Sequence, residues 1–139
     1  MMRMCWRRDR IAMVGAAALA LAACAVGGNA AEPKPVRHVD AKGAAQLVKE
    51  AKPVVLDVRT PREFKAGHVA NAKNIDFNAE GFEKKIGELD RGATYLVYCQ
   101  SGGRSTKSLE TFKKLGFKSI IHLDGGYRGW EKAGQPFER

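Results

Sequence analysis

Residues 95–105 read YLVYCQSGGRS, an apolar run that passes through a cysteine into two glycines and an arginine. The apolar residues 95–98 predict a buried strand, and the amphipathic run 105–115 predicts a helix directly after it. Cys99 therefore stands between a strand and a helix. Because the first N–H groups of a helix lack partners and the helix dipole favours negative charge, a cysteine placed there acquires a lowered pKa and becomes a nucleophile. The alternative is an inert cysteine before an ordinary turn, but the paired glycines, the arginine and the helix start together favour a reactive thiol.

Short apolar runs and amphipathic runs alternate along the chain on both sides of this stretch. Five strands are expected, at residues 38–39, 54–56, 72–75, 95–98 and 120–123. Helices are expected at residues 41–48, 61–65, 78–89, 105–115 and 127–133. This alternation predicts an α/β fold, a single domain with a central, mostly parallel five-stranded sheet and helices on both faces.

A second polar segment also follows a predicted strand. Asp57 and Arg59 come directly after the apolar run 54–56. Since parallel sheets bind ligands beyond the carboxyl ends of their strands, Asp57 and Cys99 are predicted to face a common site. Residues 60–63, TPRE, match a capping box, with threonine as the N-cap, proline at the first helical position and glutamate at the third.

The first part of the chain has a different composition. Residues 1–10 carry four arginines, and residues 11–23 carry no charge and are mostly alanine. A basic head before a short apolar segment is typical of a secretory signal. The predicted organisation is a signal peptide at 1–24, with cleavage before Cys24 or near Ala30/Ala31, then a flexible tether at 25–36 and a folded domain at 37–139.

The cleavage site has two alternatives. Leu21-Ala22-Ala23-Cys24 resembles the lipobox of bacterial lipoproteins, in which the cysteine is lipidated and becomes the new N-terminus. Lipidation of Cys24 would anchor the protein to a membrane, whereas ordinary cleavage near Ala30 or Ala31 would release it. Both alternatives predict an exported, periplasmic protein.

The chain contains three cysteines. Cys5 leaves with the leader and Cys24 is lipidated or removed, so Cys99 is expected to be the one free thiol of the exported domain. The absence of a CxxC pair excludes thioredoxin-like exchange and a cysteine zinc site. The histidines are isolated along the sequence and offer no metal-ligand spacing: His38, His68 and His122. We therefore expect neither a metal nor a cofactor.

The charge is strongly basic, with a net value of +9 at pH 7. The lysines are spread along the chain, whereas nucleic-acid-binding proteins gather basic residues into blocks with interleaved aromatic side chains. Nucleic acid is therefore not an expected partner. A mild positive field would instead help to attract a small anion.

Three parts of the chain resemble the signatures of the rhodanese family, and together they cover nearly all of the predicted domain. They are LDVRTPREF at 56–64 with GHV at 67–69 and AKNI at 72–75, then CQSGGRS at 99–105, and LDGGYRGW at 123–130. One departure is Ala70-Asn71, where the family often has Pro-Gly. Because asparagine tolerates the left-handed conformation, this turn is expected to be kept.

The resemblance implies a sulfurtransferase with Cys99 as its catalytic residue. Cys99 would attack the outer sulfur of thiosulfate or a similar donor, release sulfite and carry a persulfide, which cyanide or another thiophilic acceptor would then remove. The loop that binds the substrate would comprise Gln100, Ser101, Gly102, Gly103, Arg104 and Ser105. Its N–H groups would stabilise the thiolate and persulfide anions. Asp57 and Arg59 would lie behind the loop and tie it to its neighbours.

Arg104 has two candidate roles within this loop. Its guanidinium could attract the anionic donor, because it is a fixed cation with several hydrogen-bond donors. Alternatively it could pair with a carboxylate and hold the loop in place.

Two other functions remain open at this stage. A sulfur carrier or binding module of the same family would form the persulfide without turnover. Phosphatases and arsenate reductases of related fold enclose a tetrahedral oxyanion with a Cys-x5-Arg loop, whereas only four residues separate Cys99 from Arg104 here. A smaller ring of N–H groups suits a single sulfur better than a phosphate, so the loop length favours sulfur transfer.

Overall fold

A computed structural model describes residues 36–139 of the chain. The predicted signal peptide, the lipidation at Cys24 and nearly all of the predicted tether lie outside these residues. The tether was predicted to end at residue 36, but Val36 already begins the first strand, so the domain starts one residue earlier than expected. Within residues 36–139, no helix has both the length and the apolar character needed to cross a membrane.

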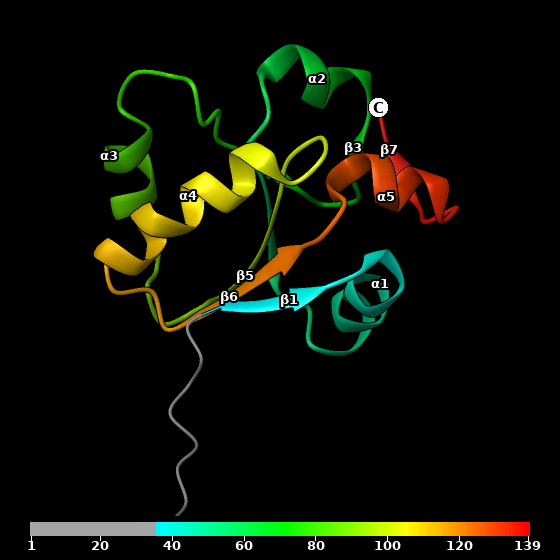
Figure 1. Cartoon of the computed structure of the whole chain (residues 1–139), viewed down its shortest axis with the longest axis horizontal. Coiled ribbons are helices and arrows are strands. Elements are labelled where there is room, and N and C mark those ends of the chain that lie inside the picture. Colours follow the sequence, from blue (N-terminus) through cyan, green and yellow to red (C-terminus); the bar gives the residue numbers. More distant parts are fainter. Residues whose placement is uncertain (1–35) are drawn as a thin grey trace, which may run out of the picture.

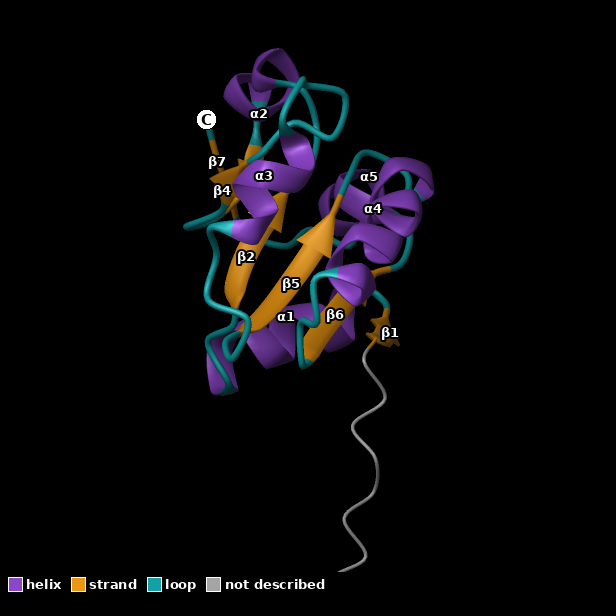
Figure 2. Cartoon of the chain, turned by 90° about the vertical axis from the view of Figure 1, so that its left-hand side faces the viewer, coloured by secondary structure: helices purple, strands orange, loops and turns teal. Residues whose placement is uncertain are grey.

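The centre of the fold is a five-stranded sheet in the order β1-β6-β5-β2-β4 (Figures 1 and 2). Its strands are β1 (Val36–Val39), β2 (Val54–Asp57), β4 (Lys73–Asn74), β5 (Thr94–Tyr98) and β6 (Ser119–Leu123). All neighbouring pairs in this sheet are parallel, which confirms the predicted α/β class and the predicted strands. A separate antiparallel pair, β3 (His68–Val69) with β7 (Phe137–Glu138), was not predicted.

Helices cover both faces of the sheet, as expected. Their bounds are α1 (Ala41–Glu50), α2 (Pro61–Ala66), α3 (Phe82–Gly87), α4 (Gly103–Lys114) and α5 (Gly126–Lys132). Figure 1 shows α1 and α5 on one side of the sheet and α3 and α4 on the other, with α2 near the carboxyl ends of the strands.

Each face of the sheet has its own hydrophobic core. Successive side chains of a strand point to opposite faces, and β5 follows this rule. Leu96 and Tyr98 pack in the core beneath α1 and α5. Val97 and Cys99 belong to the core beneath α3 and α4. The alternation along β5 therefore places the thiol on the α4 side of the sheet.

The helix predicted over residues 78–89 is wrong in its extent. The structure has only α3 in this region, and Gly81 precedes it with a left-handed φ of 78°. The Asp76 side chain accepts a hydrogen bond from the Asn78 N–H at 2.9 Å, so Asn78 lies in a turn and does not start a helix. Phe82 and Ile86, two of the apolar residues whose spacing suggested the longer helix, are nevertheless buried in α3.

Other local predictions are confirmed. Thr60 and Glu63 form a complete capping box, with Pro61 at the start of α2. The helix predicted from residue 41 starts there, and Asp40 caps it by accepting a hydrogen bond from the Gly43 N–H. Asn71 adopts the left-handed conformation, with a φ of 61°, so the turn is kept despite the departure from Pro-Gly.

Candidate active site

Cys99 lies between β5 and α4, as predicted, and is 1% exposed. Two groups donate hydrogen bonds to its sulfur: the Gly102 N–H at 3.1 Å and the Ser105 hydroxyl at 3.4 Å. Gly102 precedes α4 with a φ of 106°, a conformation that is strained for residues with a Cβ atom. This conformation lets the chain turn back so that its N–H points at the sulfur.

The surroundings of the sulfur favour the thiolate. Burial by itself raises the pKa of the Cys99 thiol, because a charged sulfur loses solvation. Hydrogen bonds from the Ser105 hydroxyl and from the N–H groups of Ser105, Ser101 and Gly102 outweigh burial, so the net effect lowers the pKa. In this structure the hydrogen bonds of the loop therefore lower the pKa of the Cys99 thiol.

The first residues of α5 hold this loop from the other side. The Tyr127 N–H donates to the Cys99 carbonyl at 2.7 Å, and the Arg128 N–H donates to the Gln100 carbonyl at 3.0 Å. Gly126 has a φ of 58°, and a Cβ atom there would lie 2.8 Å from both Gln100 C and Ser101 N. Only glycine lets the two backbones approach so closely.

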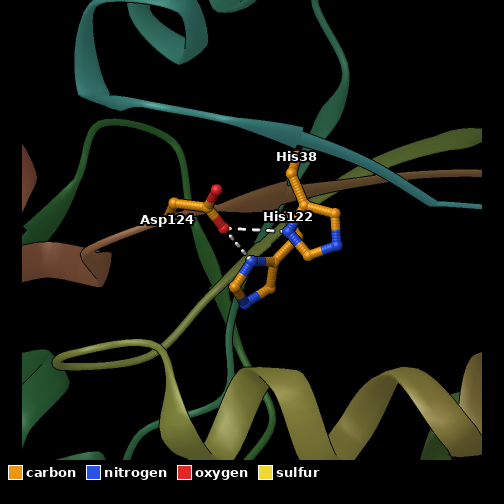
Figure 3. A group of neighbouring side chains, drawn as sticks. All are labelled: His38, His122 and Asp124. Atoms are coloured by element: carbon orange, nitrogen blue, oxygen red, sulfur yellow. Dashed lines mark hydrogen bonds and ion pairs between the residues drawn. The ribbon is translucent and has the colours of Figure 1, made fainter.

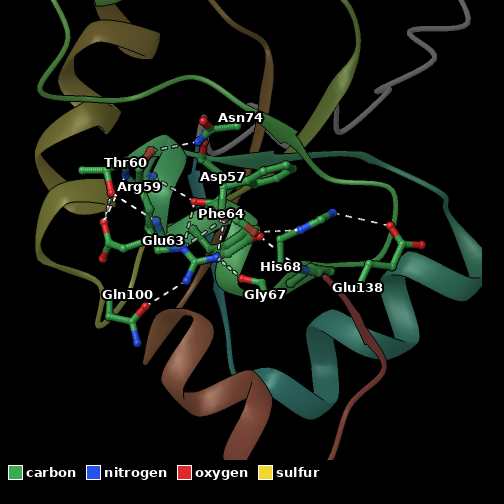
Figure 4. Close-up of polar contacts among 12 residues, drawn as sticks. Asp57, Arg59, Thr60, Glu63, Phe64, Gly67, His68, Asn74, Gln100 and Glu138 are labelled. Atoms are coloured by element: carbon green, nitrogen blue, oxygen red, sulfur yellow. Dashed lines mark hydrogen bonds and ion pairs between the residues drawn. The ribbon is translucent and has the colours of Figure 1, made fainter.

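Asp57 and Arg59 form a buried ion pair behind the loop (Figure 4). The Arg59 guanidinium binds both carboxylate oxygens of Asp57, with a shortest distance of 2.7 Å. It also donates to the Gly67 carbonyl at 2.6 Å and to Gln100 Oε1 at 2.9 Å. Arg59 thus connects the last residue of β2, the end of α2 and the cysteine loop, and its contacts are with these supports rather than with the sulfur.

Arg104 is paired with Glu63 of α2. Its two terminal nitrogens donate to the two carboxylate oxygens at 2.8 and 2.7 Å. Two roles were considered for Arg104: attracting the anionic donor, or pairing with a carboxylate to hold the loop. The contact with Glu63 is the one that the second role requires. The pairing lowers the pKa of Glu63 to about 2, although burial opposes this effect and the Thr60 N–H and hydroxyl add to it.

The Glu63–Arg104 pair should make stability depend on pH below 4.5. The folded pKa of Glu63 is about 2 and its ordinary value is 4.5, so the stabilisation is complete above pH 4.5 and is lost as the pH falls to 2. Glu63→Gln keeps the capping hydrogen bond but not the charge. We expect this variant to lose about 1–2 kcal/mol at pH 7 and to show a shallower fall in stability between pH 4.5 and 2. Urea denaturation across this range, with the exposed Glu80→Gln as control, measures the difference; parallel curves for Glu63→Gln and the wild type would contradict it.

A pocket of about 300 Å³ adjoins the cysteine loop, and Arg59, Glu63, Gln100, Tyr127 and Glu131 contribute to its walls. A larger pocket of about 650 Å³ lies beside Val36, Thr94 and Ser119, at the amino ends of the strands and away from Cys99. The smaller pocket is the candidate substrate site because Gln100 of the loop forms part of it.

The view of the histidines as isolated is wrong for two of them. The parallel register of β1 and β6 places His38 opposite His122. Both rings bind Asp124 Oδ1 through Nδ1, at 2.9 Å for His38 and 2.7 Å for His122, and polar atoms of the three side chains lie within 4.8 Å of one another (Figure 3). Sequence separation hid this cluster, since only strand pairing brings the two histidines together. His68, in β3, does not belong to this cluster, and its Nδ1 contacts the Phe64 carbonyl at 3.0 Å.

The His122 ring also reaches the cysteine loop, which was not predicted. Its Nε2 lies 2.8 Å from the Ser105 hydroxyl, which in turn contacts the Cys99 sulfur. The spacing His122-x-Asp124 at the carboxyl end of a predicted strand was the only sequence signal for this arrangement.

The fold and the loop define a class of α/β proteins that hold a cysteine in a ring of backbone N–H groups at the carboxyl end of a central strand. The sequence matches the family profile of the Rhodanese-like domain over residues 40–133. The chain therefore belongs to the rhodanese-like family, and the resemblance inferred from its signatures is confirmed.

Relatives with this domain include sulfurtransferases. The chain is 37% identical over 91 residues to thiosulfate sulfurtransferase 16 from the chloroplast of Arabidopsis thaliana, covering 58% of this chain and 76% of that protein. It is 26% identical over 101 residues to the thiosulfate sulfurtransferase GlpE of Vibrio cholerae, covering 73% of this chain and 93% of that protein. Among solved structures, a rhodanese-related protein from Thermoplasma volcanium has a TM-score of 0.66 at 32% identity, covering 73% of this chain and 97% of that one.

Proposed function

We propose that this protein is a sulfurtransferase that carries a sulfane sulfur as a persulfide on Cys99. The observation that carries this proposal is the environment of the buried Cys99 sulfur, which accepts hydrogen bonds from Gly102 and Ser105. These hydrogen bonds lower the pKa of the Cys99 thiol. Such a site stabilises a negative charge on a single sulfur atom. The relatives named as thiosulfate sulfurtransferases support the same chemistry.

The proposed cycle has two steps. The Cys99 thiolate attacks the outer sulfur of thiosulfate, and the sulfur–sulfur bond of the donor breaks so that its electron pair leaves with sulfite. The product is a persulfide anion on Cys99. Cyanide then attacks the outer sulfur of the persulfide, thiocyanate leaves and the thiolate is regenerated. Neither step needs a metal or a cofactor in this scheme.

The position of Arg104 favours sulfur transfer over phosphate chemistry. In an oxyanion-binding loop of the phosphatase type, the arginine must be free to donate hydrogen bonds to the anion. Here both terminal nitrogens of Arg104 bind Glu63, and the Arg59 guanidinium is bound to Asp57. A phosphate enclosed by the loop would have to compete with these carboxylates for an arginine, whereas the persulfide places a single sulfur in the loop and needs only its ring of N–H groups.

The test is mass spectrometry of the intact protein after treatment with thiosulfate. The wild type should gain one sulfur atom, cyanide should remove it as thiocyanate, and Cys99→Ser should do neither. Repeated turnover identifies an enzyme, and a persulfide with one round of release identifies a carrier. An unmodified wild type, or hydrolysis of aryl phosphates that depends on Cys99, would overturn the proposal.

We also propose that the protein acts outside the cytoplasm, after export by its basic and apolar leader. Lipidation at Cys24 would keep it on a membrane. Phase partitioning in detergent, for the wild type and Cys24→Ala, tests the anchor: a wild type that stays in the aqueous phase is not lipidated.

A further inference from the structure

A continuous chain of hydrogen bonds runs from the buried thiol to the protein surface. The Cys99 sulfur contacts Ser105 Oγ at 3.4 Å, and Ser105 Oγ contacts His122 Nε2 at 2.8 Å. On the other side of the ring, His122 Nδ1 contacts Asp124 Oδ1 at 2.7 Å, which also binds His38 Nδ1 at 2.9 Å (Figure 3). Cys99, Ser105 and His122 are buried, whereas the Asp124 and His38 side chains are each 53% exposed. This series of hydrogen bonds therefore links the thiol to solvent through groups that can each donate or accept a proton.

The partners of His122 determine where its hydrogens lie. An ionised carboxylate can only accept hydrogen bonds, and the pKa of Asp124 is lowered: burial opposes ionisation, but the hydrogen bonds from His38 and His122 outweigh it. His122 Nδ1 must therefore carry a hydrogen to bind Asp124. In the neutral ring this leaves a lone pair on Nε2, and that lone pair faces the Ser105 hydroxyl.

The Ser105 hydroxyl has one hydrogen and three acceptors within reach. They are His122 Nε2 at 2.8 Å, the Gly102 carbonyl at 3.0 Å and the Cys99 sulfur at 3.4 Å. If the hydroxyl donates to a neutral His122, it cannot donate to the sulfur. If His122 carries a second hydrogen on Nε2, the ring donates to Ser105 and the hydroxyl is free to donate to the thiolate. The protonation state of His122 is thus coupled to the hydrogen bond on the sulfur.

We propose that His122, held by Asp124, takes the proton of the Cys99 thiol through Ser105. The S–H bond breaks and its hydrogen passes to Ser105 Oγ, while the hydroxyl hydrogen passes to His122 Nε2. The products are a thiolate that accepts from Ser105 and an imidazolium that donates to Ser105 and to Asp124. Atoms and charge balance, since one neutral pair becomes one ion pair. His122 and Asp124 are positioning residues in this scheme because neither touches the sulfur.

The charges around the ring are consistent with this transfer. Asp124, in the turn after β6, supplies the negative charge that stabilises an imidazolium. The centroid of the His38 ring, from β1, lies 5.0 Å from that of the His122 ring, and both rings bind the same Asp124 oxygen. From α4, Thr106 offers only a neutral hydroxyl, at 3.5 Å. Arg104 acts on the thiolate as well, so the loss of His122 should raise the thiol pKa without abolishing the thiolate.

This inference deepens the proposed function, and its test is independent of any sulfur donor. The rate of alkylation of Cys99 by iodoacetamide is measured against pH for the full chain, because only the thiolate reacts. In His122→Gln and Asp124→Asn the midpoint of the profile should move up by about 1 pH unit, so that alkylation below the midpoint slows about tenfold. Ser105→Ala should produce a shift in the same direction. His68→Gln is the matched control and should leave the profile unchanged.

A reciprocal measurement separates coupling from a structural role. The titration of His122, followed by nuclear magnetic resonance, should move to lower pH in Cys99→Ser, because the thiolate that stabilises the imidazolium is gone. If His122→Gln does not fold, Asp124→Asn remains available because its side chain lies at the surface. Unchanged alkylation profiles in folded Asp124→Asn and Ser105→Ala, or an unchanged His122 titration in Cys99→Ser, would overturn the proposal. A protein that alkylates as expected but forms no persulfide would overturn the sulfur-transfer proposal alone.

Discussion

Replacing Gly126 with alanine is expected to lower sulfur transfer by about 100-fold or more and to destabilise the domain by about 2–5 kcal/mol. Gly126 has a φ of 58°, and a Cβ atom would press on the Cys99 carbonyl and lie 2.8 Å from Gln100 C and Ser101 N. These are backbone atoms of the cysteine loop, so they cannot rotate away as a side chain would. The loop would have to move, and the hydrogen bonds from Tyr127 and Arg128 to its carbonyls would lengthen or break.

The measurements are thiocyanate formation and urea denaturation of the same preparations. Gly129→Ala is the matched control, because it lies in the same helix and its Cβ atom would meet only the Asp124 carbonyl at an ordinary 3.6 Å. We expect this control to keep its activity and its stability. A fully active Gly126→Ala protein would show that the close contact between α5 and the loop is not required.

Replacing Arg59 with leucine is expected to cost about 3–5 kcal/mol of folding free energy. The side chain is 2% exposed and that of Asp57 is 0% exposed, so the substitution leaves a buried carboxylate without its cation. It also removes the hydrogen bonds to Gly67 and Gln100, so the loop loses its support from behind. The activity that survives in the folded fraction should therefore also fall.

A second substitution tests the cause of this loss. Asp57→Asn in the Arg59→Leu protein removes the unpaired charge. The asparagine still offers a side-chain oxygen that can accept the hydrogen bond from the backbone N–H of position 59. Urea denaturation should show that the double variant is more stable than Arg59→Leu alone. Arg62→Leu, at an exposed position of α2, is the control and should stay within about 0.5 kcal/mol of the wild type. A double variant less stable than the single one would mean that the buried charge is not the source of the loss.

The order of the elements and the place of the thiol could be predicted because they depend on nearby residues. The apolar run before Cys99 and the glycines after it form a strand and a helix start wherever the rest of the chain lies. The capping box at Thr60 is likewise complete within four residues, and the structure contains it. Where a local signal competed with another, prediction was weaker: the turn at Asp76 prevailed over the helical spacing that follows it.

The partners of the functional side chains could not be predicted in the same way. Arg104 binds Glu63, which is 41 positions away, although each was noted separately in the sequence. The short antiparallel pair of β3 and β7 joins residues from the middle and the end of the chain, so neither segment signals it alone.

The sequence by itself therefore determined the class of fold and the cysteine at the strand-to-helix junction, because hydrogen bonding and apolar periodicity over a few residues decide these features. The family was inferred from the resemblance of three signature segments, and the family profile confirms it. Only the tertiary structure decided what surrounds that cysteine. The parallel pairing of β1 with β6 sets His38 beside His122, and the packing of α4 against β6 brings His122 to Ser105. Such contacts follow from strand order and register, which are settled by the packing of the whole sheet rather than by any one stretch.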